Sequence, residues 1–161
     1  MALVSSDKFL KALCTVLVLL ASPVVLAEPD ETEEEYSANT VGGFIGGTGA
    51  GRRDNGLTLA LTYEYRFNES FGLGAEAERV FGDLDFWLAT IPFSYHFGEW
   101  KVFAGPGLEK LDGGDTETLL RIGGEYAIEI SDSWEMSPTV ALDFVDGDQE
   151  IILGVLFAYG F

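Results

Sequence analysis

The chain has 161 residues, of which 47% are hydrophobic, and its formal net charge is −18. Only 9 residues are Lys or Arg against 27 Asp or Glu, which disfavours a nucleic-acid partner because phosphate neutralisation needs clustered basic side chains. A chain that is both this apolar and this acidic is best explained if the two kinds of residue lie on different surfaces of one domain. The 20 glycines and the 13% of aromatic residues are typical of an all-β protein with many turns.

Residues 1–27 have the layout of a secretory signal peptide. Two lysines precede an apolar run over 12–21, and the small residue Ala27 ends the segment. The run is shorter than the roughly 20 residues that a transmembrane helix needs, so we predict cleavage after Ala27, with an uncleaved anchor as the lesser alternative. Cys14, the only cysteine, lies inside this segment, and the mature chain would therefore contain no disulfide.

Residues 28–38 form an acidic segment that we predict to be a disordered tail, because a run of like charges does not collapse into a core. Contact of this segment with a basic partner or a cation is the lesser alternative. After this segment the chain changes to short apolar–polar alternations separated by turn residues, without a helical period. We therefore predict one all-β domain over 39–161.

Period-two alternation predicts eight β-strands in this domain. In the second strand every other residue from position 57 to position 67 is Leu, Tyr or Phe, and the residues between them are small, polar or charged. Alternation in the other strands likewise gives the domain one aromatic-rich apolar face and one polar face. The predicted strands cover 39–48, 56–67, 70–80, 86–97, 100–109, 117–130, 134–145 and 149–161.

The distribution of aromatic residues and of loop lengths predicts a membrane barrel. Aromatic residues gather near strand ends, as in the girdles at the lipid–water interfaces of outer-membrane barrels. Short turns such as 68–70 alternate with longer loops such as 49–55, which is the pattern of such barrels with their short turns in the periplasm. The predicted fold is an eight-stranded antiparallel transmembrane β-barrel with both termini in the periplasm. A soluble lipocalin-like barrel with the aromatic face inside is the alternative.

The last strand has an aromatic residue at every second position and ends the chain on Phe161. This strand resembles the C-terminal sorting signal of outer-membrane β-barrel proteins. The resemblance implies recognition by the barrel-assembly machinery during insertion. The residues that carry it are Gly154, Phe157, Tyr159 and Phe161.

Residues 39–161 as a whole resemble the small eight-stranded outer-membrane β-barrels, similar in plan to the OmpA transmembrane domain and OmpX. The resemblance rests on strand number, alternation and the C-terminal residues, and it brings over no catalytic residue. It implies a monomer in the outer membrane of a Gram-negative bacterium, surrounded by outer-membrane lipids and lipopolysaccharide. Members of the group serve as anchors, adhesins, host-defence factors or narrow channels, so the fold does not decide between these roles.

The polar face carries charges that would meet inside the barrel, where buried charges require partners. Because acids outnumber bases, two functions stay open. One is a structural or surface-interaction barrel with a polar plug, and the other is a porin-like channel with a narrow cation-favouring path. A wide pore is not expected, because eight strands leave an interior just filled by side chains. The predicted interior network comprises Glu64, Arg66, Glu76, Lys101, Arg121, Glu125 and Glu129, and Glu78, Glu109, Glu135 and Asp143 share its face.

Enzymatic activity and a resident cofactor are not expected. His96 is the only histidine, with Ser94 on the same predicted inner face. The lipid A deacylase family, which also has an eight-stranded outer-membrane barrel, has the order His-x-Ser with the active residues facing lipid. The order here is reversed and the face is inward, so a lipid-modifying enzyme is the weakest alternative.

The longer loops contain closely spaced aspartates over 82–85, 112–115 and 146–148. Such carboxylates suit calcium, but aspartate and glycine are also ordinary turn residues, which is the reading that we favour. In the first long loop, Arg52-Arg53 are best explained as solvated, with contact to lipopolysaccharide phosphates as the alternative.

Overall fold

A computed structural model gives the fold and describes residues 36–51, 54–111 and 114–161. The predicted signal peptide, the acidic run up to Glu35 and the Arg52-Arg53 pair lie outside the described residues. No helix in the described part of the chain is long and apolar enough to cross a membrane. Its strands are β1 (Asn39–Ala50), β2 (Asp54–Arg66), β3 (Phe71–Gly82), β4 (Phe86–Thr90), β5 (Phe93–Phe97), β6 (Trp100–Leu111), β7 (Thr116–Tyr126), β8 (Ile128–Ser131), β9 (Trp134–Val145) and β10 (Asp148–Gly160).

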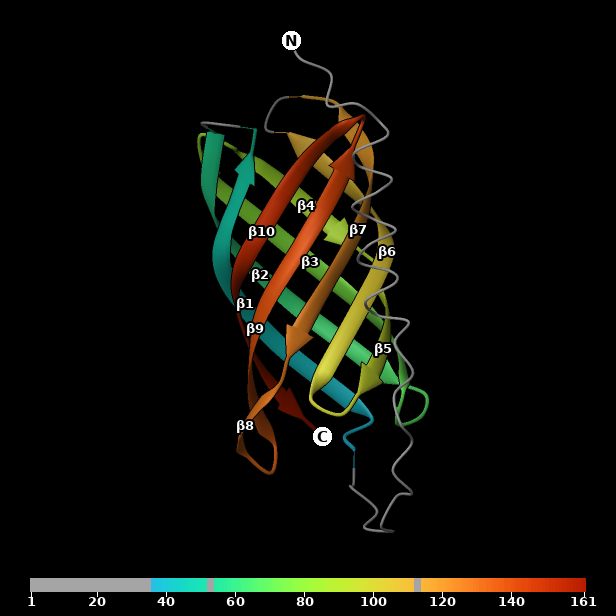
Figure 1. Cartoon of the computed structure of the whole chain (residues 1–161). Coiled ribbons are helices and arrows are strands. Elements are labelled where there is room, and N and C mark those ends of the chain that lie inside the picture. The colour runs from blue at the N-terminus through green and yellow to red at the C-terminus, as the bar shows by residue number, and fades with distance from the viewer. Residues whose placement is uncertain (1–35, 52–53, 112–113) are drawn as a thin grey trace, which may run out of the picture. The chain divides into compact units, whose positions relative to one another are not determined.

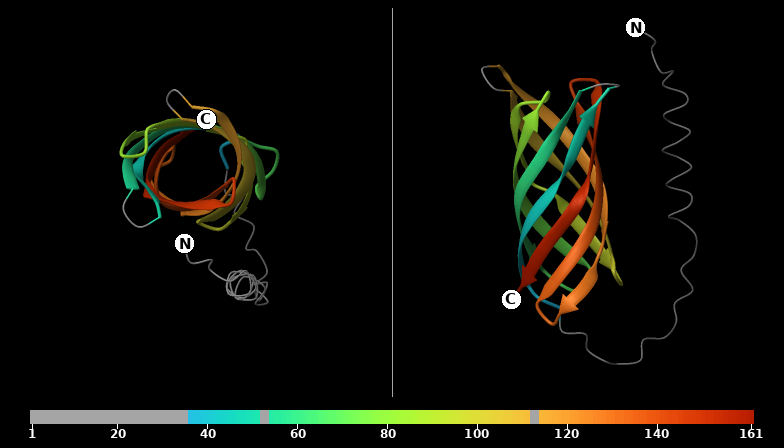
Figure 2. Two further views of the ribbon diagram at one scale, coloured as in Figure 1. Left: turned by 90° about the horizontal axis from the view of Figure 1, so that it is seen from above. Right: turned by 90° about the vertical axis from the view of Figure 1, so that its left-hand side faces the viewer.

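The strands form one closed antiparallel barrel with eight positions, which confirms the predicted fold class. The positions are β1, β2, β3, the pair β4 and β5, β6, the pair β7 and β8, β9 and β10. β1 pairs with both β2 and β10, so the first strand closes on the last (Figures 1 and 2). This closing seam runs from the register pair Thr40–Gly160 to the pair Ala50–Glu150. Closure leaves an open sheet edge only at the short strand β8, which pairs with β9 alone.

Two of the predicted strands are interrupted. β4 and β5 are separated next to Pro92, which has no N–H to donate to the ladder. The Pro92 carbonyl still pairs, because Gly74 N donates to it at 2.7 Å. β7 and β8 are separated at Ala127, whose N–H donates to Glu99 O at 2.7 Å. The barrel therefore stays closed at both interruptions.

The two ends of the barrel are named by what lies at them. The terminal end carries Asn39 and Phe161, which exchange backbone hydrogen bonds of 3.1 and 2.9 Å. The opposite end, which we call the loop end, carries the connection from β1 to β2 (Figure 2). Two to four residues separate consecutive strands at both ends, so the predicted alternation of short turns and longer loops is wrong, because the strands extend into the predicted loops. At the loop end, Asp146 and Gly147 have φ angles of 42° and 93°, which a two-residue type I′ hairpin turn requires.

The outward face is apolar, as predicted, and aromatic rings contact one another around the terminal end. Ring centroids are 5.1 Å apart for Phe71 and Tyr95, and 4.9 Å apart for Trp100 and Tyr126. This group is called the terminal-end girdle. It consists of Tyr65, Phe67, Phe71, Phe93, Tyr95, Phe97, Trp100, Tyr126, Trp134, Tyr159 and Phe161.

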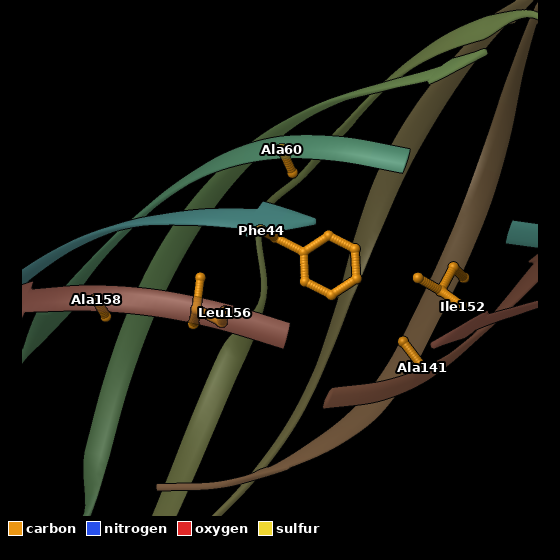
Figure 3. Packing of buried hydrophobic residues seen from close by; sticks show 6 residues of the cluster. All are labelled: Phe44, Ala60, Ala141, Ile152, Leu156 and Ala158. Carbon is orange, nitrogen blue, oxygen red and sulfur yellow. The ribbon is translucent and has the colours of Figure 1, made fainter. Parts of the chain in front are cut away.

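Glycines on the inner wall make room for aromatic rings. A Cβ atom on Gly154 would lie 2.4 Å from Phe44 Cζ, and one on Gly123 would lie 2.3 Å from Phe103 Cζ. Each ring therefore covers backbone that only glycine leaves free. Figure 3 shows Phe44 with the buried apolar residues of its cluster: Ala60, Ala141, Ile152, Leu156 and Ala158.

Candidate functional site: the barrel interior

The first ion cluster lies nearer the terminal end and is built around Lys101. Its Nζ is 2.6 Å from Glu125 Oε2 and 3.3 Å from Glu64 Oε2. Glu64 also accepts a hydrogen bond from the Ser94 hydroxyl, and its Oε1 is 2.7 Å from His96 Nε2. One ammonium thus bridges two carboxylates that come from opposite sides of the interior.

The second ion cluster is built around Arg121, whose side chain is only 2% exposed. Its Nε and Nη2 donate to the two carboxylate oxygens of Asp143 at 2.8 and 2.7 Å, which is a bidentate pair. Its Nη1 is 2.9 Å from Glu76 Oε2 and 2.9 Å from Glu78 Oε2. A single guanidinium therefore serves three carboxylates and ties β3 to β7 and β9 through the interior.

Strand register creates both clusters. Arg121 is the cross-strand partner of Asp143, and Lys101 is the partner of Glu125. Opposite charges at directly paired positions stabilise a sheet. Space for the Glu64 carboxylate comes from Gly72, where a Cβ would lie 2.3 Å from Glu64 Oε1. The Glu64 carboxylate can therefore lie in this cluster only because the facing residue is a glycine.

An apolar cluster fills the interior toward the loop end. Phe86 is 1% exposed and Val80 is fully buried. The sequence prediction missed this cluster, because around Phe86 both faces of the strand are apolar and period-two alternation does not separate inside from outside. We call it the loop-end plug; it consists of Val80, Phe86, Leu88, Leu119 and Val145, with Leu84 packed against it.

A small cavity lies between the two ion clusters. Its volume is about 60 Å³, and its lining includes Glu64, Lys101 and Arg121 together with the rings of Phe44 and Phe103. A water molecule occupies about 30 Å³ in the liquid. The space therefore suits a few waters held by the charged groups.

The structure brings five of the seven predicted network residues into the two clusters: Glu64, Glu76, Lys101, Arg121 and Glu125. The other two, Arg66 and Glu129, line a second cavity of about 150 Å³ near Gly160, which lies at the terminal end. Glu129 is exposed because β8 lies beyond the break at Ala127.

Arg66 pairs with no glutamate carboxylate among the described residues. Its Nη2 donates to the backbone carbonyl of Glu69, and its guanidinium lies 4.9 Å from the Tyr36 ring. Its backbone N–H donates to Ala38 O at 2.9 Å, so residues 36–38 contact this rim of the barrel. The predicted interior network thus divides into two buried ion clusters and two residues, Arg66 and Glu129, at the rim of the terminal end.

Ser94 and His96 do not form a nucleophile–base pair in this structure. Both bond to the same Glu64 oxygen instead of to each other, and both lie inside the barrel. A relay would need the histidine between the serine and the carboxylate. Within the described residues, no group of three His, Cys, Asp or Glu side chains could hold a metal ion.

The residues of the predicted sorting signal lie on two faces. Phe157, Tyr159 and Phe161 are exposed on the outer wall, and the Tyr159 ring centroid is 5.2 Å from that of Trp134. Gly154 lies on the inner wall under Phe44, where it makes room for the ring.

The sequence matches no protein-family model and no curated protein. The fold is similar to that of the N-terminal β-barrel domain of Pseudomonas aeruginosa OprF, at 12% identity and a TM-score of 0.66, over 79% of this chain and 100% of that one. It is also similar to Neisserial surface protein A, at 14% identity and a TM-score of 0.54. Ail, the attachment invasion locus protein of Yersinia pestis, matches at 13% identity and a TM-score of 0.52. The last two likenesses each cover 79% of this chain and 99% of the other. At these identities the likeness shows the fold, a closed eight-stranded barrel of the outer-membrane type.

Proposed function

We propose that the protein is a monomeric, non-catalytic barrel of the outer membrane of a Gram-negative bacterium, of structural or surface-interaction type, with a closed interior. The outward apolar face and the terminal-end girdle support insertion in a bilayer. The fold shared with small outer-membrane barrels supports the same location. The signal-like residues 1–27 and the sorting-signal-like last strand support export and insertion by the barrel-assembly machinery.

The observation that carries the closed interior is the loop-end plug beside the Arg121 cluster. Phe86 and Leu88 are almost fully buried at the end from which solutes would enter. Beneath them, Arg121 is held by three carboxylates. A hydrated ion would have to displace packed side chains and break a buried ion pair, and breaking a buried pair is costly.

Two measurements test this proposal. Outer membranes run in SDS with and without boiling should give a heat-dependent band shift, which closed membrane barrels show. In planar bilayers the purified protein should give no stepwise conductance above that of a protein-free membrane. A soluble periplasmic protein without a band shift would overturn the membrane assignment.

A narrow cation path is the second candidate, and the unpaired carboxylates near the plug favour it. Glu109 and Glu150 are buried, and each has one carboxylate oxygen without a hydrogen-bond partner among the described residues. Such groups attract cations. Cation-selective conductance steps that decrease on Glu125→Gln would establish this alternative in place of the closed barrel.

A further inference from the structure

The outer wall carries two basic side chains in the part of the chain that the structure describes, and both flank one tryptophan. Arg79 on β3 is the register partner of Trp87 on β4, and Trp87 is the register partner of Lys110 on β6. Arg79, Trp87 and Lys110 therefore form one row across three strands, which we call the Trp87 row. The residues around it on this face, such as Phe81 and Leu108, are exposed and apolar.

The Trp87 row lies about one membrane thickness from the terminal-end girdle. Trp100 in the girdle and Lys110 are ten positions apart on β6. At a rise of about 3.3 Å per residue this is about 33 Å along the strand, or about 25 Å along the barrel axis at the usual strand tilt. The apolar band of outer-membrane barrels is about 25 Å tall. With the girdle at one interface, the row lies at the other, at the level of the lipid headgroups.

The contacts of Arg79 leave one guanidinium nitrogen without a hydrogen-bond partner among the described residues. Its Cζ lies 5.2 Å from the Trp87 ring and 5.4 Å from the Phe81 ring, and Nη2 pairs with Asp85. Nη1 is buried without a hydrogen-bond partner among the described residues. The aromatic rings and Asp85 therefore hold the guanidinium against the wall with one donor nitrogen unused.

The second cation of the row is Lys110, which is exposed and makes no ion pair within the described residues. Asp85 neutralises one of the two positive charges, so the row keeps a net positive charge on an otherwise acidic protein. An unused guanidinium nitrogen beside an ammonium suits a phosphate oxygen, and an aromatic ring at this depth suits the adjoining glycerol or sugar region.

We propose that Arg79, Trp87 and Lys110 form an outer-wall site for the phosphate group of an outer-leaflet lipid. The site rests on the proposed function, because only an inserted barrel brings this row to lipid headgroups. Each basic residue near a membrane surface contributes about a fivefold preference for anionic lipid. Because Asp85 offsets one charge, we expect about a fivefold preference for the row as a whole.

The test measures which lipid lies beside Trp87. Protein purified from membranes is placed in phosphatidylcholine nanodiscs, with Trp100→Phe and Trp134→Phe leaving Trp87 as the reporter. Fluorescence quenching by brominated phosphatidate should exceed that by brominated phosphatidylcholine with about a fivefold difference in apparent affinity. Adding Arg79→Gln and Lys110→Gln should remove the difference. The matched control carries Trp87→Phe and Trp134→Phe; its reporter, Trp100, has no outward cation beside it and should show no preference.

The possible outcomes separate this site from the proposed function. If the protein neither shifts in SDS on heating nor shows quenching by any brominated lipid, the membrane assignment fails. If it shifts and Trp100 is quenched equally by both lipids, but Trp87 shows no preference, only the lipid site fails. A preference that survives in the Arg79→Gln, Lys110→Gln protein also overturns it. Millimolar inorganic phosphate should leave the preference of Trp87 for brominated phosphatidate unchanged. If inorganic phosphate abolishes this preference, the site binds soluble anions and the lipid assignment is wrong.

Discussion

Gly46 and Gly154 face each other across the seam where the first strand closes on the last, and the Phe44 ring covers both. A Cβ atom on Gly46 would lie 2.4 Å from Leu153 O, and one on Gly154 would lie 2.5 Å from Ile45 O. Backbone on one side and an aromatic ring on the other leave no room for a side chain. The seam that closes the barrel therefore depends on two glycines and one ring.

Alanine at either seam glycine should destabilise the barrel. Gly154→Ala or Gly46→Ala forces the strands apart or displaces Phe44, and overpacking of this kind costs about 1–3 kcal/mol. The measurement is urea-induced unfolding in lipid vesicles. Gly43→Ala is the matched control, because Gly43 lies in β1 like Gly46, and a Cβ atom on Gly43 would meet nothing within 4 Å. Equal losses for Gly43→Ala and Gly154→Ala would contradict the packing argument.

Removing the guanidinium of Arg121 should cost more than removing any exposed charge. In Arg121→Met the side chains of Glu76, Glu78 and Asp143 lose their shared cation, and breaking a buried ion pair costs about 3–5 kcal/mol. Lys110→Met removes the same charge from the exposed outer wall and should change the free energy of unfolding in zwitterionic vesicles little.

A second variant shows whether the loss comes from stranded carboxylates. Combining Arg121→Met with Glu78→Gln and Asp143→Asn removes two of the three carboxylates, so it should recover part of the stability that Arg121→Met loses. If the combined variant is less stable than Arg121→Met alone, the carboxylates contribute through contacts other than the ion pairs with Arg121.

Period-two alternation was sufficient to predict the fold, because almost every outward position is apolar and the turns are rich in Gly, Asp and Asn. It located the eight barrel positions and the outward rings correctly. The interruption at Pro92 was visible as a proline, but that its carbonyl still pairs with Gly74 follows only from the structure.

The interior was harder to predict, because inward positions obey no single chemistry. Charged residues at inward positions can be recognised in the sequence, and the pairs Arg121–Asp143 and Lys101–Glu125 then follow from the strand register. The inward position of Phe44 and Phe86 cannot be recognised in this way, because an inward aromatic residue looks the same in sequence as an outward one. The signal that would identify Phe44 is the pair of glycines at 46 and 154, but this pair can be recognised only once β1 is known to pair with β10.

The terminal Phe161 should matter more for assembly than for stability. Its ring is 61% exposed and contacts Tyr159, whereas its backbone pairs with Asn39. Phe161→Ala keeps the backbone pairing and should lower the unfolding free energy by at most about 1 kcal/mol. If the barrel-assembly machinery reads this residue, the amount of folded protein in the outer membrane should fall severalfold.

Phe67→Ala is the control for this effect. Phe67 is also an exposed girdle ring, 48% exposed, but it lies in the middle of the chain. Phe67→Ala should lower the unfolding free energy of the purified protein as little as Phe161→Ala does. It should leave the amount of folded protein in the outer membrane of cells unchanged. Equal assembly defects in the two variants would mean that the girdle as a whole, and not the C-terminal residue, limits insertion.

The depth of the tryptophans should reveal how the barrel spans the bilayer. Trp87 and Trp100 lie toward opposite ends of the outer wall, at 58% and 52% exposure, so both should meet the headgroup regions. In single-tryptophan variants, each should be quenched most by lipids brominated near the glycerol. Leu61→Trp, in a protein without the other tryptophans, is the reference, because Leu61 is 72% exposed near the middle of β2 and should be quenched most by bromines deep in the chains. Deep quenching of Trp87 would place Arg79 and Lys110 in hydrocarbon, and both the membrane position and the lipid site derived from it would then be wrong.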